Sequence, residues 1–154
     1  NLRNYKGEKI GDIIIRSTNK LKSINLSSRY NSSAIDEFLL IFLVACKCKG
    51  ISIFNNLGEL NKKESKRLDW GIKILSLMGV KVKRIKNSGL KIWGQENFNL
   101  NKKIIIKNYL KDHRVFMTSV IAALSFGGRW KIHDKDSIKS SFPDFLKIIS
   151  KLKS

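Results

Sequence analysis

Apolar residues recur with helical spacing in three stretches of the chain, and a short polar cluster precedes each of them. The apolar stretches cover residues 38–45, 68–78 and 115–124. Apolar positions three and four residues apart line one face of an α-helix. With their flanking polar residues and glycines, these stretches predict helices over about 34–49, 64–79 and 112–126. A fourth helix is predicted from Pro143 to about Leu152, because proline suits the first helical turn.

Short runs rich in β-branched residues lie between the helices and predict strands. They cover residues 11–16, 21–26, 51–54, 80–86, 90–93, 103–108 and 130–133. The turn Asn87-Ser88-Gly89 joins two of them as a β-hairpin, whereas residues 1–9 are expected to be a frayed start. Strands joined by helices require crossover connections, so at least part of the sheet is expected to be parallel.

The chain repeats its own pattern at an offset of 76 residues. Asp36 and Lys63 are 27 residues apart, and so are Asp112 and Lys139. Each interval holds an apolar helix, a glycine stop, a short strand and a polar loop. We therefore predict a duplicated β-α-β-α-β-β unit, the second cut short by the end of the chain. The predicted fold class is α/β (α+β), with mixed sheets and buried helices in a single domain over residues 1–154.

The net charge of +19 and the pI near 10.2 invite a nucleic-acid interpretation. The chain has 24 Lys, 21 Ile and 13 Asn but only 7 Arg, and no dense basic tract. Lysine, isoleucine and asparagine share A/T-rich codons, so codon bias explains the charge better than a nucleic-acid footprint does. The charge alone is therefore a weak guide to function, and nucleic acid is not an expected partner.

Cys46 and Cys48 form a C-x-C pair, which has neither the spacing of a zinc site nor that of a redox motif. Free thiols in a reducing cytosol are expected, and no metal site is predicted. The longest apolar stretch is far shorter than the roughly 20 residues that a membrane span needs. A cytoplasmic location is expected. Because the chain begins with Asn1 and not methionine, an upstream portion is also expected.

The polar clusters contain the residues able to carry chemistry. A helix N-terminus carries unpaired N–H groups and partial positive charge, which favour a bound anion. Lys63, Arg67 and Arg114 add cations at such starts, where the helix dipole disfavours them. Three unfavourable placements of this kind suggest that an anion normally occupies the site.

Each cluster also has a structural interpretation, which the sequence leaves open. Asp36 could support the helix dipole, or act as a general base on a substrate hydroxyl. Lys63 and Arg67 could form a solvated turn, or clamp one phosphate or carboxylate, with Glu64 beside them to move a proton. His113 alone is more often structural. No Walker, Rossmann, G-x-S-x-G or H-E-x-x-H motif is present. The residues therefore indicate a small polyanionic substrate.

In order and spacing, the clusters resemble the 5-enolpyruvylshikimate-3-phosphate synthase (3-phosphoshikimate 1-carboxyvinyltransferase) family. The resemblance covers about residues 11–152 and corresponds to the last third of that enzyme. Its motifs here are Ala34-Ile35-Asp36-Glu37, Lys63-Glu64-Ser65-Lys66-Arg67, Asp112-His113-Arg114 and Lys139-Ser140-Ser141-Phe142-Pro143. The resemblance implies part of a two-domain inside-out α/β barrel. It also implies transfer of the enolpyruvyl group from phosphoenolpyruvate to the 5-hydroxyl of shikimate 3-phosphate, with release of phosphate and without a cofactor.

The same resemblance implies a role for each motif residue. Asp36 matches the acceptor of the hydroxyl proton, and Lys63 matches a shikimate-phosphate contact. Glu64 matches the carboxyl that handles the proton of the enolpyruvyl methylene. The family's phosphoenolpyruvate ligands match Arg67, Arg114 and Lys139, with His113 beside them.

Two departures from the family pattern stand out. Lys66 occupies a position where the family usually has an acidic residue. The first domain, with its phosphate-binding loops, is absent from the chain, so we expect little activity from the chain alone and a monomer once it is complete. The alternative function is a free-standing basic module of the same fold that binds RNA or another polyanion.

Overall fold

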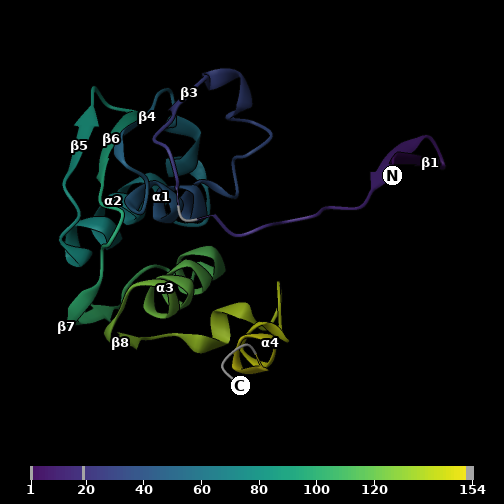
Figure 1. Cartoon of the computed structure of the whole chain (residues 1–154). Helices are drawn as coiled ribbons and strands as arrows, with labels where there is room; N and C mark the ends of the chain where they lie inside the picture. The colour runs from purple at the N-terminus through teal and green to yellow at the C-terminus, as the bar shows by residue number, and fades with distance from the viewer. Residues whose placement is uncertain (1, 19, 152–154) are drawn as a thin grey trace.

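The computed structural model of the chain describes residues 2–18 and 20–151, which form a hairpin followed by two successive units (Figure 1). The hairpin consists of β1 (Leu2–Tyr5) and β2 (Glu8–Gly11). The first unit contains β3 (Asn25–Leu26), α1 (Phe38–Cys46), β4 (Gly50–Phe54), α2 (Arg67–Met78), β5 (Val82–Ile85) and β6 (Gly89–Gly94). The second contains β7 (Leu100–Ile106), α3 (His113–Phe126), β8 (Gly127–Ile132) and α4 (Phe145–Lys151).

Both units contain a mixture of helices and strands, and the first has a mixed sheet. Its four strands lie in the order β3-β4-β6-β5. β3 and β4 are parallel, while β6 is antiparallel to both β4 and β5. In the second unit, β7 and β8 form a parallel pair. These sheets confirm the predicted α/β fold class and the predicted crossovers.

The structure also shows the predicted repeat. A shift of 76 residues moves the 3-10 helix Gly58–Lys62 of the first unit almost onto the 3-10 helix Lys135–Ile138 of the second. The same shift relates β4 to β8 and α2 to α4. The second unit is shorter, because no counterpart of β5 and β6 follows α4 in the described part of the chain.

The core lies between the first sheet and the helices α1, α2 and α3, which contact one another. α1 is apolar on all sides because it is buried on most of them. Its Phe38 and Phe42 pack against Phe54 of β4, with ring centroids 6.2 and 5.3 Å apart. Such aromatic contacts hold the start of α1 against the sheet.

Three helices begin later than predicted. α1 begins at Phe38, because residues 31–37 form turns and Glu37 makes no side-chain cap bond. α2 begins at Arg67, and a residue outside the helix caps its first turn. The Asn61 side-chain oxygen accepts the backbone N–H groups of Leu68 and Asp69.

α3 begins as predicted, with Asp112 as its N-cap. α4 begins at Phe145, two residues after Pro143, and its predicted end at Leu152 lies outside the described residues.

The predictions for the N-terminal region were wrong in three respects. Residues 2–11 form a hairpin and not a frayed start, although every residue of it is exposed. The strand predicted over 11–16 does not form, since 12–18 carry no secondary structure. The strand predicted over 21–26 is reduced to Asn25–Leu26 and a bridge between Lys22 and Lys49. A strand needs a neighbour to complete its hydrogen bonds, and within the described residues no strand lies beside 12–18.

Candidate active site

The guanidinium of Arg67 is the centre of a charged cluster built from the starts of three helices. Arg67 is the first residue of α2, and only 2% of its side chain is exposed. Its Nε donates to Asp112 Oδ2 and its Nη1 donates to Asp36 Oδ1, each at 2.8 Å. Its Nη2 donates to Glu64 and, at 3.3 Å, to Asp112 Oδ1. A guanidinium offers five N–H donors in one plane, so this single buried residue binds three carboxylates.

Asp112 is the buried partner in this cluster. It is 1% exposed and accepts a hydrogen bond from Ser65 Oγ at 2.8 Å. It also accepts the backbone N–H of Arg114 at 2.9 Å, which caps α3. Burial opposes the ionisation of Asp112, but hydrogen bonds from Arg67 and Ser65 outweigh burial and lower its pKa. Asp112 is therefore an ionised residue that joins the starts of α2 and α3.

Asp36 faces solvent on the other side of Arg67, with 41% of its side chain exposed. Its oxygens lie 3.4 Å from Lys63 Nζ and 3.9 Å from Arg114 Nη2. Burial would raise the pKa of Asp36, but the hydrogen bond from Lys63 and the charges of Arg114 and Arg67 lower it below the ordinary value of 3.8. The result is an accessible carboxylate surrounded by three cations.

Arg114 ties the start of α3 to the turn before α1. Its Nη1 donates to the backbone carbonyl of Asp36 at 2.9 Å and to Glu37 Oε1 at 2.7 Å. Its side chain is 28% exposed, and that of Lys63 is 33% exposed. Both cations can therefore reach an anion from solvent without leaving the cluster.

The chain's own carboxylates offset the cations at the helix starts. The sequence suggested that an external anion would be needed there, but Asp36, Glu37 and Asp112 already lie against them. These acids come from segments distant in sequence, which is why a pattern of neighbouring residues could not reveal them. The positive charges of Lys63, Arg67 and Arg114 are therefore compensated without an external anion. An anion that binds there has to compete with these carboxylates.

A depression of about 360 Å³ adjoins the cluster. Asp36, Glu37, His113 and Arg114 line its polar side. Apolar side chains of α1 and α3 line most of the remainder, together with Thr118, Ser141, Phe142 and Phe145. The structure thus places His113 beside the charged cluster, at the wall of a cavity large enough for a small metabolite.

Lys139 is the predicted site residue that the structure leaves apart. Its side chain is 76% exposed, and its Nζ lies 3.0 Å from Asp136 Oδ1, one turn earlier. No ion pair among the described residues joins it to the Arg67 cluster. Ser141, two residues further on, does line the depression. The other predicted residues converge, namely Asp36, Lys63, Glu64, Arg67 and Arg114.

Sequence reasoning missed two contributors to the cluster and undervalued a third. Ser65 is 2% exposed and holds Asp112, while Asn61 holds the first turn of α2. Asp112 was predicted only as a capping acid. The signal for Ser65 was its place inside Lys63-Glu64-Ser65-Lys66-Arg67, but its partner is 47 residues away.

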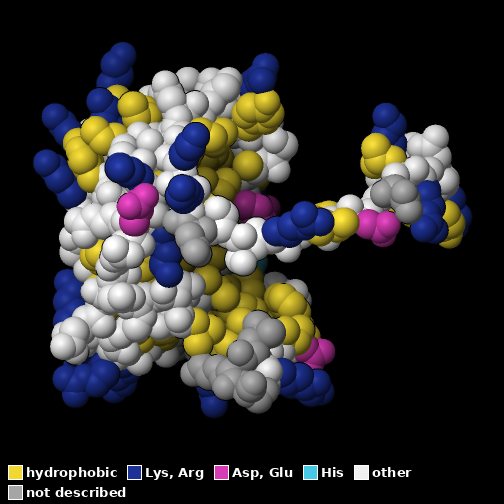
Figure 2. Space-filling model, viewed as in Figure 1, with side chains coloured by type: hydrophobic (Ala, Val, Ile, Leu, Met, Phe, Trp, Pro, Cys, Tyr) yellow, Lys and Arg dark blue, Asp and Glu magenta, His cyan; other side chains and the backbone are white. Residues whose placement is uncertain are grey.

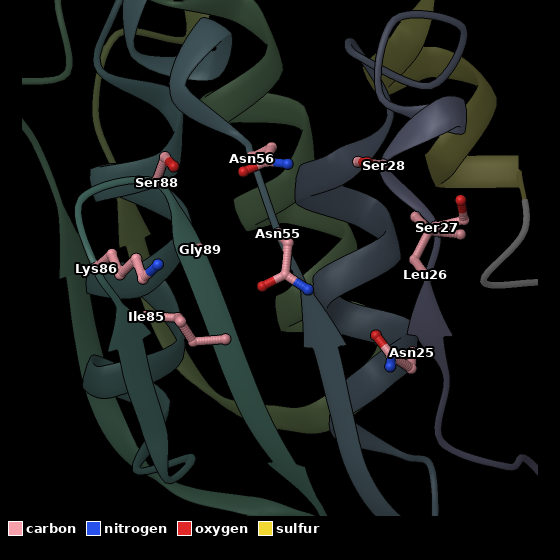
Figure 3. Close-up of a pocket in the computed structure, with 10 residues that line it drawn as sticks. All are labelled: Asn25, Leu26, Ser27, Ser28, Asn55, Asn56, Ile85, Lys86, Ser88 and Gly89. Carbon is pink, nitrogen blue, oxygen red and sulfur yellow. The ribbon is translucent and has the colours of Figure 1, made fainter.

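A second, larger depression of about 570 Å³ lies at one end of the first sheet (Figure 3). It is formed by the ends of β3, β4 and β5 and by the turn into β6. Lys86 is the one charged residue among the ten that line it, and the others carry amide, hydroxyl, aliphatic or no side-chain groups. It shares no lining residue with the cavity beside Arg67. No carboxylate or imidazole lines this depression, which distinguishes it from the cavity beside Arg67.

Two further observations concern the part of the chain that the structure describes. Within residues 2–18 and 20–151, no three His, Cys, Asp or Glu side chains gather closely enough to hold a metal ion. None of the helices in those ranges has the length and apolar character needed to cross a membrane.

Two successive units of helices and strands, with a charged cluster at the helix starts, define this chain as an α/β protein built from repeats. The sequence model described as EPSP synthase (3-phosphoshikimate 1-carboxyvinyltransferase) matches residues 5–149. The chain therefore belongs to the EPSP synthase family.

Relatives and a solved structure agree with this family. The chain is 35% identical over 152 residues to the 3-phosphoshikimate 1-carboxyvinyltransferase of Ruthia magnifica and 33% identical over 153 residues to that of Thermodesulfovibrio yellowstonii. Each match covers 99% of this chain and 34% of the relative. The EPSP synthase structure from Acinetobacter baumannii superposes with a TM-score of 0.85 at 29% identity, over 98% of this chain and 34% of the other. The chain thus spans about a third of the length of its relatives.

Proposed function

We propose that the chain provides one face of the active site of a 3-phosphoshikimate 1-carboxyvinyltransferase. The reaction moves the enolpyruvyl group of phosphoenolpyruvate to the 5-hydroxyl of shikimate 3-phosphate and releases phosphate. The observation that supports this most is the convergence of three family motifs, distant in sequence, on Arg67. Both substrates carry a phosphate and a carboxylate, which suits Lys63 and Arg114 at the accessible side of the cluster.

Asp36 accepts the proton of the reacting hydroxyl in this proposal. With its low pKa, Asp36 in the free protein is a weak base, because Lys63, Arg114 and Arg67 stabilise its ionised form. Substrate anions that bind Lys63 and Arg114 remove part of this stabilisation. The pKa of Asp36 then rises toward the range in which a carboxylate works as a general base.

Arg67 and Glu64 take part through an exchange of partners. Phosphoenolpyruvate is to be held by Arg67, Arg114 and Lys139, yet Arg67 is occupied by Asp36, Glu64 and Asp112 in the free chain. Glu64 is the most exposed of these three acids, at 54%, and is the one that the incoming anion displaces. Once released from Arg67, Glu64 is free to exchange the proton of the enolpyruvyl methylene.

Lys139 joins the site by leaving Asp136. Its ion pair with Asp136 is exposed, and exposed pairs are worth little, so a substrate phosphate can replace the carboxylate. His113 forms the neighbouring wall of the cavity. The remaining face of the cleft comes from the two thirds of the relatives that this chain does not span. Shikimate-pathway activity therefore requires that part, and no cofactor takes part.

A chimera tests the proposal. This chain replaces the corresponding third of the Thermodesulfovibrio yellowstonii enzyme, and phosphate release is measured with both substrates. We expect turnover, with a loss of 100-fold or more in kcat for Asp36→Ala and for Glu64→Ala, roughly the contribution of general acid–base catalysis. The matched control is Glu59→Gln, which removes an exposed carboxylate whose ion-pair partner among the described residues is Lys62. Absence of turnover, or equal rates in all variants, would refute the proposal.

Polyanion binding is the second candidate, and one structural feature favours it. Lys83 and Lys91 lie directly opposite each other in the first sheet, and so do Lys103 and Arg129 in the second. Like charges in such cross-strand pairs are destabilising unless an anion lies over them. Binding of RNA that weakens steeply with salt, and that Lys83→Glu and Lys91→Glu reduce, would support this function.

A further inference from the structure

Glu37 lies between two cavities that meet at the start of α1. The cavity beside Arg67 and a second cavity, also of about 360 Å³, have two lining residues in common, Glu37 and Leu40. Glu37 is the residue before α1, but its side chain makes no cap hydrogen bond to the helix. The position of its carboxylate is therefore set by tertiary partners and not by the helix that follows.

In the free chain, the carboxylate of Glu37 occupies Arg114. Arg114 Nη1 donates to Glu37 Oε1 at 2.7 Å and to the backbone carbonyl of Asp36 at 2.9 Å. Because the carbonyl also holds the guanidinium, Arg114 keeps its place when Glu37 leaves. The side chain of Glu37 is 54% exposed, and an ion pair of this exposure contributes little stability. An incoming anion can therefore displace Glu37 and leave Arg114 in position.

The second cavity offers Glu37 another cation. Its walls are mostly apolar, and the charged residues among the described residues that line it are Lys22 and Glu37. Lys22 is exposed, and no ion pair within residues 2–18 and 20–151 involves it. Apolar walls reduce the screening of a charge pair by water, so a pair between Glu37 and Lys22 at this cavity is favourable.

Few other carboxylates are available to Lys22. The chain has 12 acidic residues against 31 Lys and Arg, and Figure 2 shows the same imbalance on one face of the molecule. Glu37 is the acid that lines the same cavity as Lys22. The carboxylate of Glu37 therefore shares one cavity with Arg114 and the other with Lys22.

We propose that Glu37 is a positioning residue with two partners, Arg114 in the free chain and Lys22 when an anion occupies Arg114. In the first state, Glu37 keeps Arg114 oriented and its charge compensated. In the second, Lys22 holds the displaced carboxylate away from the bound anion, which reduces the repulsion between like charges. The proposal rests on the proposed function only in naming phosphoenolpyruvate as the anion that Arg114 binds.

The exchange of partners sets the affinity of Arg114 for anions. Binding has to break the pair between Glu37 and Arg114, and the pair between Glu37 and Lys22 that forms in its place favours binding. Loss of the Glu37 charge should therefore strengthen anion binding, and loss of the Lys22 charge should weaken it. Each change should be about threefold, which corresponds to roughly 0.6 kcal/mol and lies in the range measured for exposed ion pairs.

The first test is a titration of the chain with inorganic phosphate at constant pH and ionic strength, followed by proton NMR of its two histidines. His113 lines the cavity with Arg114 and reports binding there, whereas His133 lines neither cavity and is the internal reference. Glu37→Gln, which keeps the size of the side chain and removes its charge, should lower the dissociation constant about threefold. Lys22→Gln should raise it about threefold.

Two comparisons separate this exchange from a general effect of charge. Lys49 pairs with Lys22 through a backbone bridge, is exposed and lines neither cavity. Lys49→Gln is therefore the matched control and should leave the dissociation constant unchanged. In the Glu37→Gln background, Lys22→Gln should have no effect, because the carboxylate that Lys22 holds is gone.

Four results of this titration would overturn the proposal. The first is an equal dissociation constant in wild type and Glu37→Gln, and the second is an equal effect of Lys22→Gln and Lys49→Gln. The third is an effect of Lys22→Gln that persists in the Glu37→Gln background. The fourth is a His113 signal that phosphate does not move.

The second test uses the chimera with the Thermodesulfovibrio yellowstonii enzyme. Glu37→Gln should lower KM for phosphoenolpyruvate about threefold, with little change in kcat or in KM for shikimate 3-phosphate, because the ion-pair partner of Glu37 among the described residues is Arg114. An unchanged or raised KM for phosphoenolpyruvate in an active chimera would overturn the role of Glu37. An inactive chimera would refute the proposed function instead, and the phosphate titration of the chain would still decide the role of Glu37.

Discussion

The same repeat position behaves differently in the two units. In the first, Lys63 to Arg67 form an ordered entrance to α2, with Arg67 buried under three carboxylates. In the second, the equivalent Lys139 is exposed and pairs only with Asp136 among the ion pairs of the described residues. Tertiary partners from α1 and α3 surround the first position, while the second faces solvent. Order at these helix starts therefore depends on neighbouring units more than on the local motif.

The largest expected effect is a difference in the free energy of unfolding between a variant at the buried Arg67 cluster and a variant at the exposed Lys139 pair. Asp112→Asn removes a buried carboxylate from Arg67 and leaves the guanidinium short of charge compensation. We expect a loss of about 4 kcal/mol in the free energy of unfolding, measured by urea denaturation. Asp136→Asn, the matched change at the exposed pair, should leave the midpoint unchanged. Equal effects of the two variants would contradict the comparison.

Equivalent substitutions in α2 and α4 compare the burial of the two helices. Trp70→Ala in α2 removes a side chain that is 9% exposed and packs on Tyr109 with ring centroids 5.9 Å apart. We expect a loss of about 3 kcal/mol in the free energy of unfolding. Leu146→Ala, the equivalent change in α4, should lose about 1 kcal/mol or less, because Leu146 is 38% exposed. A loss at Leu146 as large as that at Trp70 would show that α4 is covered after all.

Acid should weaken the Arg67 cluster. The pKa values of Asp36 and Asp112 lie below 3.8 in the folded chain, so these residues resist protonation that the unfolded chain accepts. Their contribution to stability is complete above that ordinary pKa and is lost as the pH falls below it, toward the folded pKa values. Urea midpoints measured from neutral pH downward should fall in this window. The fall should be shallower in Asp112→Asn, and an identical fall would argue against the role of Asp112.

The smallest expected effect concerns the cap of α2. Asn61→Ala leaves the N–H groups of Leu68 and Asp69 without their acceptor, which should cost about 1 kcal/mol in the free energy of unfolding. Asn61→Asp keeps the acceptor but replaces the N–H that Asn61 donates to Asp69 Oδ1 with a second carboxylate, so it should retain only part of the stability at neutral pH. Thermal unfolding followed by circular dichroism distinguishes the two variants, and equal destabilisation by both would contradict a capping role.

Local signals explain which parts of the fold could be predicted from sequence. The Asn87-Ser88-Gly89 turn, the stop of α2 at Gly79 with its φ of 89° and the capping Asp112 depend on a few neighbouring residues. The strand over 11–16 was predicted from equally good β-branched residues and did not form. No strand lies beside residues 12–18 in the part of the chain that the structure describes, and the periodicity of a segment contains no information about its partners.

The candidate site shows the same limit. Family motifs identified Asp36, Lys63, Glu64, Arg67 and Arg114, and the fold brings these residues together. The sequence did not reveal that Arg67 is already saturated by carboxylates, because its partners Asp36 and Asp112 lie 31 and 45 residues away. The roles of Ser65 and Asn61 also depend on tertiary contacts. The residues of the family motifs can be identified from sequence, but the partners of their charges cannot.

The most direct test of the account is the pKa of the Asp36 carboxyl, followed by carbon-13 NMR in the chimera. The account predicts a value below 3.8 without ligands and a clear rise when shikimate 3-phosphate binds, because the substrate anion takes over Lys63 and its neighbours. Asp69 is the internal reference: burial opposes its ionisation, but hydrogen bonds from Arg84 and Asn61 and the charges of Arg84 and Lys66 lower its pKa, which should respond much less than that of Asp36. A pKa of Asp36 that is the same with and without the substrate would contradict the account.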